Sequence, residues 1–296
     1  MINDIWILAT ASLVAAACAL VGVFLILRRQ ALMGDAISHS VLLGIVLAYL
    51  ITDSRALPIM LGGAVIIGLL TAWLSDSLHR VGKLQSDASI GIVFTLFFAI
   101  GVILVSLYTG QIDLDQECVL YGEIAFVPFD TIYIGGLEDG IEIGPRAFWA
   151  IAIVFTIVLI TIILSFNRLQ TVAFHPNLAL SLGINIVFWH YLLMTLVSIT
   201  TVASFDAVGA ILVVALLVIP ASSAYLIAKS LKTMLWIAVA YSQVAVIIGY
   251  SLSYALDSSI SASIAVSAGL LLFITILILE IQKRRRHRLI SQSEAA

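Results

Sequence analysis

An aspartate and a histidine stand four positions apart in a largely apolar stretch of the chain. They are Asp35 and His39, in the run MGDAISHS. Residues four apart share one face of an α-helix, so a helix brings this carboxylate and imidazole together. Oxygen and nitrogen donors at this spacing form half of a site for Mn²⁺, Fe²⁺ or Zn²⁺, completed by another helix, a second chain or water. Alternatively, Asp35 caps a helix behind Gly34 and His39 donates a hydrogen bond inside a bundle. The spacing alone favours neither.

Two other residues are candidates for lining a transport pathway. Asp206 stands at the predicted start of an apolar helix, where it either caps the helix, which is the favoured interpretation, or lines an outer mouth. Pro220 removes a backbone donor within that helix and should kink it, and broken helices often line transport routes. His190, between Trp189 and Tyr191, is typical of an aromatic belt at a membrane interface.

The composition excludes a water-soluble protein. Of the 296 residues, 62% are hydrophobic and 10% charged, and the mean hydropathy is +1.18, so most of the surface must face the lipid bilayer. The net charge of −3 gives no basic face for nucleic acid. Cys18 lies in an apolar run and Cys118 in a polar loop, which predicts neither a disulfide framework nor a thiolate metal cluster. The first apolar run lacks a preceding basic segment, so we expect a retained span rather than a signal peptide.

Apolar runs long enough to cross a bilayer predict an all-α polytopic membrane protein. The runs do not alternate with period two, which excludes a β-barrel. Eight crossings are also compatible with the sequence, because the second and seventh runs carry polar or helix-breaking residues. The nine runs are residues 5–27, 31–51, 57–75, 88–108, 147–166, 186–204, 207–228, 234–255 and 260–281.

The distribution of Lys and Arg predicts the orientation. With nine spans, twelve of the fourteen basic residues fall on one side, and only Arg55 and Arg146 fall on the other. Positive charge is retained in the cytoplasm, so the N-terminus is expected outside and the basic tail, residues 282–296, inside. This topology places Asp35 only about one turn from the inner bases, whereas a transport site is expected nearer the midplane.

Two hydrophilic segments interrupt the single domain predicted over residues 1–296. Residues 109–146 carry eight acids against one base, Arg146. This outer segment either attracts cations or docks a partner, or it is simply a solvated loop. Residues 167–185 are expected in the cytoplasm, with a short helix around Leu178 ended by Gly183. Gly62, Gly63 and Gly68 are typical of closely packed helices.

Three segments resemble one known family. They are RRQALMGDAISHSVLLG (residues 28–44), AFHPNLALSLGI (173–184) and VGAILVVALLVIPA (208–221). The order and spacing of these segments over nearly the whole chain resemble the permease subunits of bacterial ABC importers for manganese, zinc and iron, which are related to siderophore and cobalamin permeases. The first segment is specific to the family. The third segment is mostly apolar and by itself would be only weak evidence for the resemblance.

The resemblance implies a role and partners for the chain. It implies a cytoplasmic-membrane subunit that pairs with a second permease and two cytoplasmic ATP-binding subunits, receives Mn²⁺, Zn²⁺ or Fe²⁺ from an external metal-binding protein, and holds no permanent cofactor. Asp35 and His39 would then belong to the metal site of the pathway. His175 stands where the family often has an acid. The implied ATPase-coupling residues are His175, Asn177, Leu178, Ala179, Ser181, Leu182 and Gly183.

Two functions from other classes stay open at the level of sequence. One is a secondary transporter in which Asp35 and His39 relay protons, and the other is a receptor or assembly protein that acts through its acidic outer segment. The sequence contains no Gly-x-x-x-x-Gly-Lys-Ser/Thr loop and no His-Glu-x-x-His helix. Any energy from ATP must therefore come from another subunit. Oxygen and nitrogen ligands admit manganese, zinc and iron alike.

Overall fold

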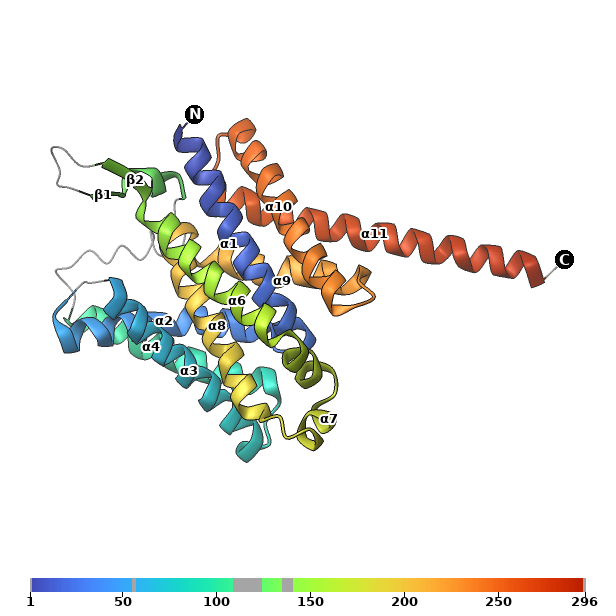
Figure 1. Ribbon diagram of the computed structural model, residues 1–296, viewed down its shortest axis with the longest axis horizontal. Helices are drawn as coiled ribbons and strands as arrows, with labels where there is room; N and C mark the ends of the chain where they lie inside the picture. The colour runs from blue at the N-terminus through green and yellow to red at the C-terminus, as the bar shows by residue number, and fades with distance from the viewer. Residues whose placement is uncertain (1, 55–56, 109–123, 135–140, 295–296) are drawn as a thin grey trace.

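The computed structural model describes residues 2–54, 57–108, 124–134 and 141–294. Within these residues, nine helices are long and apolar enough to cross a membrane, which confirms the predicted number of spans. They are α1 (Ile2–Leu27), α2 (Ala31–Thr52), α3 (Leu57–Gly82), α4 (Ser86–Tyr108), α6 (Arg146–Phe174), α8 (Ile186–Val208), α9 (Ala210–Ile227), α10 (Leu231–Leu256) and α11 (Ile260–Glu294). The basic residues that follow residue 281 continue α11, whose C-terminal half extends away from the other helices (Figure 1).

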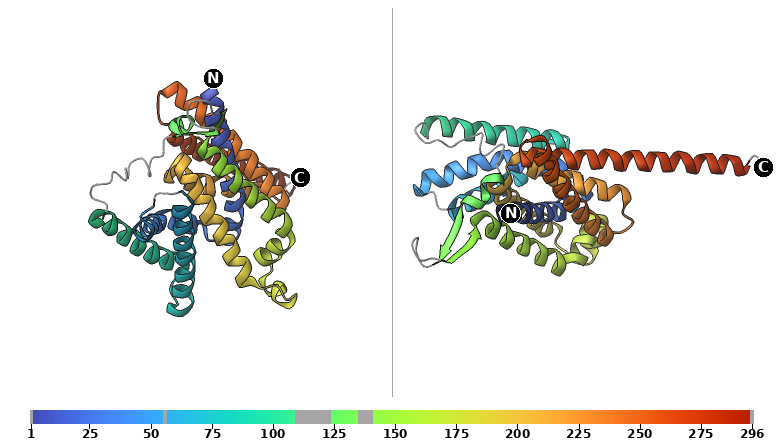
Figure 2. Two further views of the ribbon diagram at one scale, coloured as in Figure 1. Left: turned by 60° about the vertical axis from the view of Figure 1, so that its left-hand side comes forward. Right: turned by 90° about the horizontal axis from the view of Figure 1, so that it is seen from above.

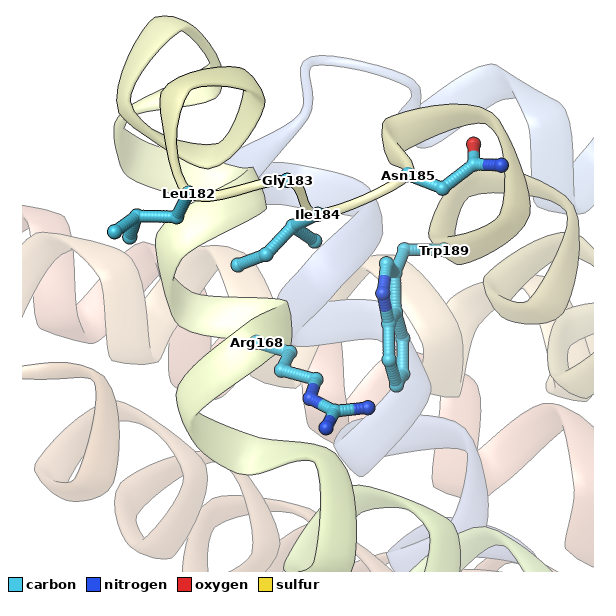
Figure 3. A pocket seen from close by; sticks show the side chains of 6 residues that line it. All are labelled: Arg168, Leu182, Gly183, Ile184, Asn185 and Trp189. Carbon is cyan, nitrogen blue, oxygen red and sulfur yellow. The ribbon is translucent and has the colours of Figure 1, made fainter.

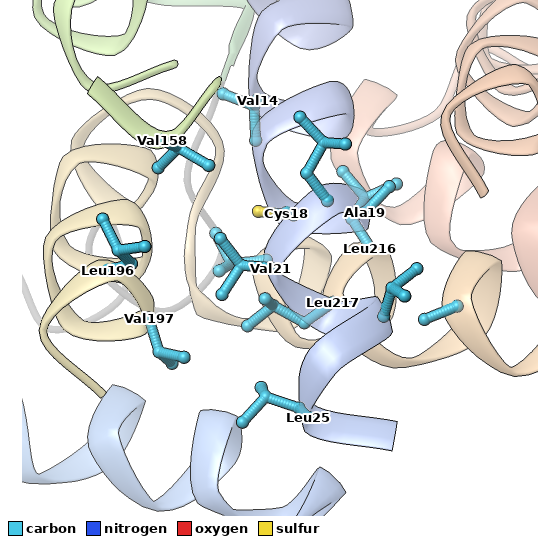
Figure 4. Close-up of a cluster of buried hydrophobic side chains, with 14 of the residues drawn as sticks. Val14, Cys18, Ala19, Val21, Leu25, Val158, Leu196, Val197, Leu216 and Leu217 are labelled. Carbon is cyan, nitrogen blue, oxygen red and sulfur yellow. The ribbon is translucent and has the colours of Figure 1, made fainter. Parts of the chain in front are cut away.

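Helix α1 lies at the centre of the larger group of helices, against α6, α8, α9 and α10 (Figure 1). Its alanine-rich face allows close approach, which is how helices associate where lipid supplies no hydrophobic driving force. Around the buried Cys18, side chains of α1 meet Val158 of α6, Leu196 of α8 and Leu216 of α9 (Figure 4). The core of the chain is therefore built on its first helix.

Helices α2, α3 and α4 form a second group, which contacts the larger group mainly through α8 (Figure 2). Glycines set the crossing of α2 and α3: a Cβ added to Gly44 would lie 2.6 Å from the Gly63 carbonyl oxygen, and one added to Gly63 would meet Ala48. Gly68 likewise faces Ser198 of α8. These contacts confirm the packing prediction for Gly63 and Gly68, but it is wrong for Gly62, which has no such neighbour within 4 Å.

The adjacent Gly62 and Gly63 provide a matched test of this crossing. We expect Gly63→Val to destabilise the protein by about 1–3 kcal/mol, because the two backbones must separate to admit the side chain. Gly62→Val places the same side chain one residue away in open space and should be close to neutral. The measurement is the midpoint of thermal unfolding in detergent. Equal midpoints for the two variants would contradict the crossing described here.

A small β-structure occurs between α4 and α6, which the all-α prediction missed. A 3₁₀ turn, η1 (Ile124–Phe129), leads into β1 (Thr131–Ile134), which pairs antiparallel with β2 (Ile141–Pro145). Ile124 is buried, and η1 lies against α1. The described part of the acidic segment is thus anchored to the bundle rather than being a free solvated loop, while residues 109–123 and 135–140 lie outside the described residues.

The boundary between α8 and α9 differs from the prediction. Helix α8 continues to Val208, so Asp206 lies in its last turn and is not the cap of the following helix. The break falls at Gly209, which is the N-terminal cap residue of α9. Pro220 is buried inside α9, which remains helical on both sides of it. The prediction failed because the hydrophobic run continues through the break, whereas the break itself depends on one glycine.

The backbone of Gly209 makes this residue difficult to replace. Its φ of 78° and ψ of 165° belong to a region that is essentially restricted to glycine. We therefore expect Gly209→Ala to cost about 1–3 kcal/mol of stability. Thermal unfolding of the detergent-solubilised protein measures this loss, and an unchanged midpoint would show that a side chain is tolerated at the break.

Candidate metal-binding site

The two candidate ligands lie on one face of α2, in its second and third turns. Helix α2 begins at Ala31, and Gln30 is its N-terminal cap. Asp35 Oδ1 lies 3.4 Å from His39 Nε2, as the four-residue spacing predicts. Asp35 is therefore inside the helix, and the interpretation of Asp35 as a cap is wrong. Gly34 is buried, and a Cβ there would lie 3.1 Å from the Leu217 side chain.

Aromatic rings of α4 hold the imidazole. The His39 ring stacks on Phe94 with centroids 5.8 Å apart and meets Phe98 edge-on at 5.7 Å. The side chains of His39 and Asp35 are nevertheless 33% and 37% exposed at the surface of the single chain. Exposed ionisable groups on a membrane span are costly in lipid, so this surface fits contact with protein or a water-filled pathway.

The described part of the chain offers only two of the ligands that a metal site at Asp35 and His39 would need. Among the residues that the structure describes, no three His, Cys, Asp or Glu side chains gather closely enough to hold a metal ion. Asp35 and His39 thus offer one oxygen and one nitrogen donor, whereas a four-coordinate transition metal requires two more. Within the described residues, further ligands for a metal at this pair would have to come from water or from another chain. An incomplete set suits transient binding, because a transported ion must also leave.

A second group of ionisable residues was not predicted from the sequence. The Arg28 Nη1 donates to His190 Nδ1 at 3.1 Å, and His190 Nε2 lies 3.2 Å from Asp76 Oδ2. Arg80 Nη2 lies 3.6 Å from the same carboxylate oxygen. The aromatic-belt interpretation of His190 is therefore wrong, since its side chain is only 12% exposed. The one signal in the sequence is the i,i+4 spacing of Asp76 and Arg80.

This group also shows where α2 begins. Asp76 lies six residues before the end of α3, and His190 lies four residues after the start of α8. At 1.5 Å per residue these positions are about 6–9 Å inside the helix ends. Arg28, and with it the start of α2, is therefore set into the bundle.

The predicted short helix after α6 is present as α7 (Pro176–Ser181). Gly183 has a φ of +72° and donates to Leu180 O, and Ile184 donates to Ala179 O, which together make a Schellman ending. Ala179 is buried, whereas Leu178, Leu180 and Leu182 are 50–63% exposed. His175, Asn177 and Ser181 are also exposed. Helix α7 thus presents apolar and polar side chains outward from one end of the bundle, called here the α7 end (Figure 1).

A pocket of about 390 Å³ lies beside α7. Figure 3 shows Arg168 of α6 reaching toward the ring of Trp189 of α8, and the guanidinium carbon is 5.7 Å from the ring centroid. The chain from Leu182 to Asn185 forms the other wall. The Asn185 side chain accepts from Phe188 N and so caps α8. This arrangement connects α7 directly to the start of α8.

The structure thus brings Asp35 and His39 together and gathers the seven residues around α7 at another location. Asp206 and Pro220 lie in two further helices, α8 and α9, and their part in a pathway stays a prediction.

Comparisons with known proteins agree on one family. The profile of the ABC 3 transport family matches residues 3–279. The chain is 46% identical over 266 residues to the manganese transport system membrane protein MntD of Bacillus subtilis, covering 90% of this chain and 88% of that protein. It is 41% identical to the zinc transport system membrane protein TroD of Treponema pallidum, covering 88% and 70%. The solved structure of PsaBC from Streptococcus pneumoniae in complex with Fab matches with a TM-score of 0.76 and 30% identity, covering 93% and 91%.

Proposed function

Since the chain belongs to the ABC 3 transport family, we propose that it is the membrane permease subunit of an ATP-driven importer of divalent transition metals, with manganese favoured. The observation that carries this proposal is the 46% identity to a manganese transport membrane protein over 90% of the chain. The 41% identity to a zinc transport protein keeps zinc as a second cargo, and an oxygen and nitrogen ligand set suits both metals.

Asp35 and His39 bind the metal in transit. The carboxylate and the imidazole offer one oxygen and one nitrogen 3.4 Å apart, and the rings of Phe94 and Phe98 restrict the orientation of the imidazole. A second permease covers this partly exposed face of α2. A two-fold related copy would contribute its own Asp/His pair and nearly complete a four-ligand set.

Separate cytoplasmic subunits hydrolyse ATP, and α7 transmits their movement. Exposed Leu178 and Leu182 fit a groove on such a subunit, since exposed apolar clusters commonly mark docking sites. The Schellman ending and the Asn185 cap join α7 to α8 through only a few residues. A displacement of α7 is therefore passed to α8, which changes the access to the metal pair from outside to inside.

The α7 end of the bundle faces the cytoplasm. The supporting observation is the excess of positive charge there, from Arg28, Arg80, Lys83 and Arg168. The opposite end, which includes η1 and the β-hairpin, then faces outward, where an external binding protein delivers the metal. The C-terminus is cytoplasmic.

Uptake into vesicles tests this function. The permease is reconstituted together with the cytoplasmic ATP-binding subunits and the external metal-binding protein proposed above, and uptake of radioactive Mn²⁺ and Zn²⁺ is measured with ATP or with a nonhydrolysable analogue. We expect uptake that requires ATP hydrolysis and survives collapse of the proton gradient. Uptake that instead disappears with the proton gradient would favour a secondary transporter, and no uptake by a verified, folded complex would favour a receptor or assembly role.

A further inference from the structure

Three separate parts of the chain contribute to the cluster of Arg28, Asp76, Arg80 and His190, called here the charge cluster. Arg28 comes from the connection between α1 and α2, Asp76 and Arg80 come from α3, and His190 comes from α8. Asp76 and His190 are 16% and 12% exposed, whereas Arg80 is largely exposed. The two groups of helices therefore meet here through charged side chains, at the point where α2 begins.

The direction of the contacts follows from the chemistry of the groups. A guanidinium has only donors, so Nδ1 of His190 must accept from Arg28, and the ring proton is then on Nε2, which faces the Asp76 carboxylate. Burial lowers the pKa of Arg28 to about 10, and the charge of Asp76 opposes this shift, so the guanidinium stays cationic at neutral pH. His190 thus lies between the Arg28 guanidinium and the Asp76 carboxylate. Each of these two charges offsets the free-energy cost of burying the other.

The charge cluster differs chemically from the Asp35 and His39 pair. Both contain an aspartate and a histidine, but the carboxylate and imidazole of the cluster already contact Arg80 and Arg28. A divalent cation there would have to displace guanidinium groups of like charge. Aromatic rings, not cations, flank His39. The cluster is therefore suited to holding helices together rather than to binding metal.

The connection between Arg28 and α2 is short and rigid. Arg29 has a φ of +57°, Arg29 N donates to Ile26 O, and Gln30 N donates to Leu25 O, so α1 ends in a Schellman motif with an arginine at the position usually occupied by glycine. Met33 N then donates to Gln30 O as α2 begins. These hydrogen bonds restrict the backbone dihedral angles between Arg28 and the first turn of α2. A contact that fixes the Arg28 side chain therefore also fixes the direction in which α2 begins.

We propose that Arg28, Asp76 and His190 are positioning residues for metal binding: they fix the base of α2 against α3 and α8, and so set the placement of Asp35 and His39. This inference rests on the metal-binding role proposed above for that pair. Loss of the charge cluster should weaken metal binding without removing a ligand. Loss of partners that orient ligands typically lowers metal affinity 10–100-fold, and because this cluster acts through the backbone we expect about tenfold.

The test compares Arg28→Gln and His190→Phe with Arg29→Gln in the complete transporter. Arg29 is the adjacent arginine, but it is exposed and lies outside the charge cluster. We expect KM for Mn²⁺ to rise about tenfold in the first two variants, with kcat per folded complex reduced much less, and both parameters to be unchanged in Arg29→Gln. The double variant should be no worse than either single variant, because each breaks the same contact. Arg28→Lys, which keeps the cation, should restore part of the affinity.

Two controls separate this role from a loss of stability and from failure of the proposed function. Gly249→Val, at the crossing of α10 with Ile264 of α11, lowers stability far from α2 and should leave KM unchanged. Spin labels at exposed Ile51 of α2 and Val187 of α8 report the direction of α2 independently of transport. We expect Arg28→Gln to broaden their distance distribution. A parent-like KM, or an unchanged distribution if the parent complex moves no Mn²⁺, would overturn the inference.

Discussion

Replacement of His39 by alanine is expected to lower ATP-driven Mn²⁺ uptake at least about tenfold. The change removes one of the two metal donors that we propose for the chain, and in a two-fold pair of identical permeases it would remove two of four. Loss of a residue that only hydrogen-bonds to a metal ligand typically lowers metal affinity or activity 10–100-fold. Loss of a direct ligand should lower it at least as much. Initial rates of radioactive Mn²⁺ uptake into vesicles containing the complete transporter measure the effect.

Two further substitutions at the pair separate metal binding from packing. His39→Phe keeps a ring to contact Phe94 and Phe98 but has no nitrogen donor, so it should be as defective as the alanine variant. Asp35→Asn keeps the volume and replaces a charged ligand by a neutral one, so it should also lose uptake. Parent-like uptake by His39→Phe would remove this pair from the metal pathway while leaving the transporter function in place.

Introduction of a charge at Leu178 is expected to abolish transport without unfolding the permease. Leu178→Asp places a carboxylate on the exposed apolar face of α7, where the proposed ATPase contact would bury it, and an unpaired buried charge costs several kcal/mol. We expect at least about a hundredfold loss of ATP-driven uptake and loss of the ATPase subunit on copurification. Because Leu178 is half exposed in the single chain, the thermal unfolding midpoint of the isolated permease should hardly change.

The control for Leu178 lies in another helix. Leu256, in the last turn of α10, is 65% exposed, and Leu256→Asp adds the same charge away from α7. It should retain both the ATPase and uptake. If Leu178→Asp copurifies with the ATPase at the parent ratio and transports metal normally, then α7 is not the coupling contact.

The sequence was most informative where a single local rule decides the structure. Hydropathy was sufficient for the nine spans, and Gly183 marked the end of the short helix, because chain length in the bilayer and a left-handed ending are local properties. The pairing of β1 with β2 was missed, although Ile132, Ile134, Ile141 and Ile143 alternate on either side of a segment whose sequence is rich in glycine. Its weak signal was hidden by the acidic composition of the surrounding segment.

The candidate site was only partly predictable for a different reason. Asp35 and His39 are four residues apart, so their contact follows from helix geometry alone. Arg28 and His190 are separated by 162 residues, and only the packing of α3 and α8 on the start of α2 brings their side chains together. Because no regular sequence spacing relates His190 to Arg28, the sequence shows only a histidine between two aromatic residues, a pattern typical of a membrane interface. Long-range ionic contacts of this kind depend on tertiary structure.

The single-residue connection at Gly209 has a consequence for how the chain enters the membrane during synthesis. Two spans joined by one glycine leave no hydrophilic loop to be carried across the lipid, so α8 and α9 can insert together as a helical hairpin. In the orientation proposed above, the connection between α4 and α6 is the opposite case, because its many acidic residues would have to be translocated before α6 can insert. Polar residues inserted at Gly209 would separate α8 from α9. The two helices would then have to insert into the membrane in two separate steps, and either step could fail.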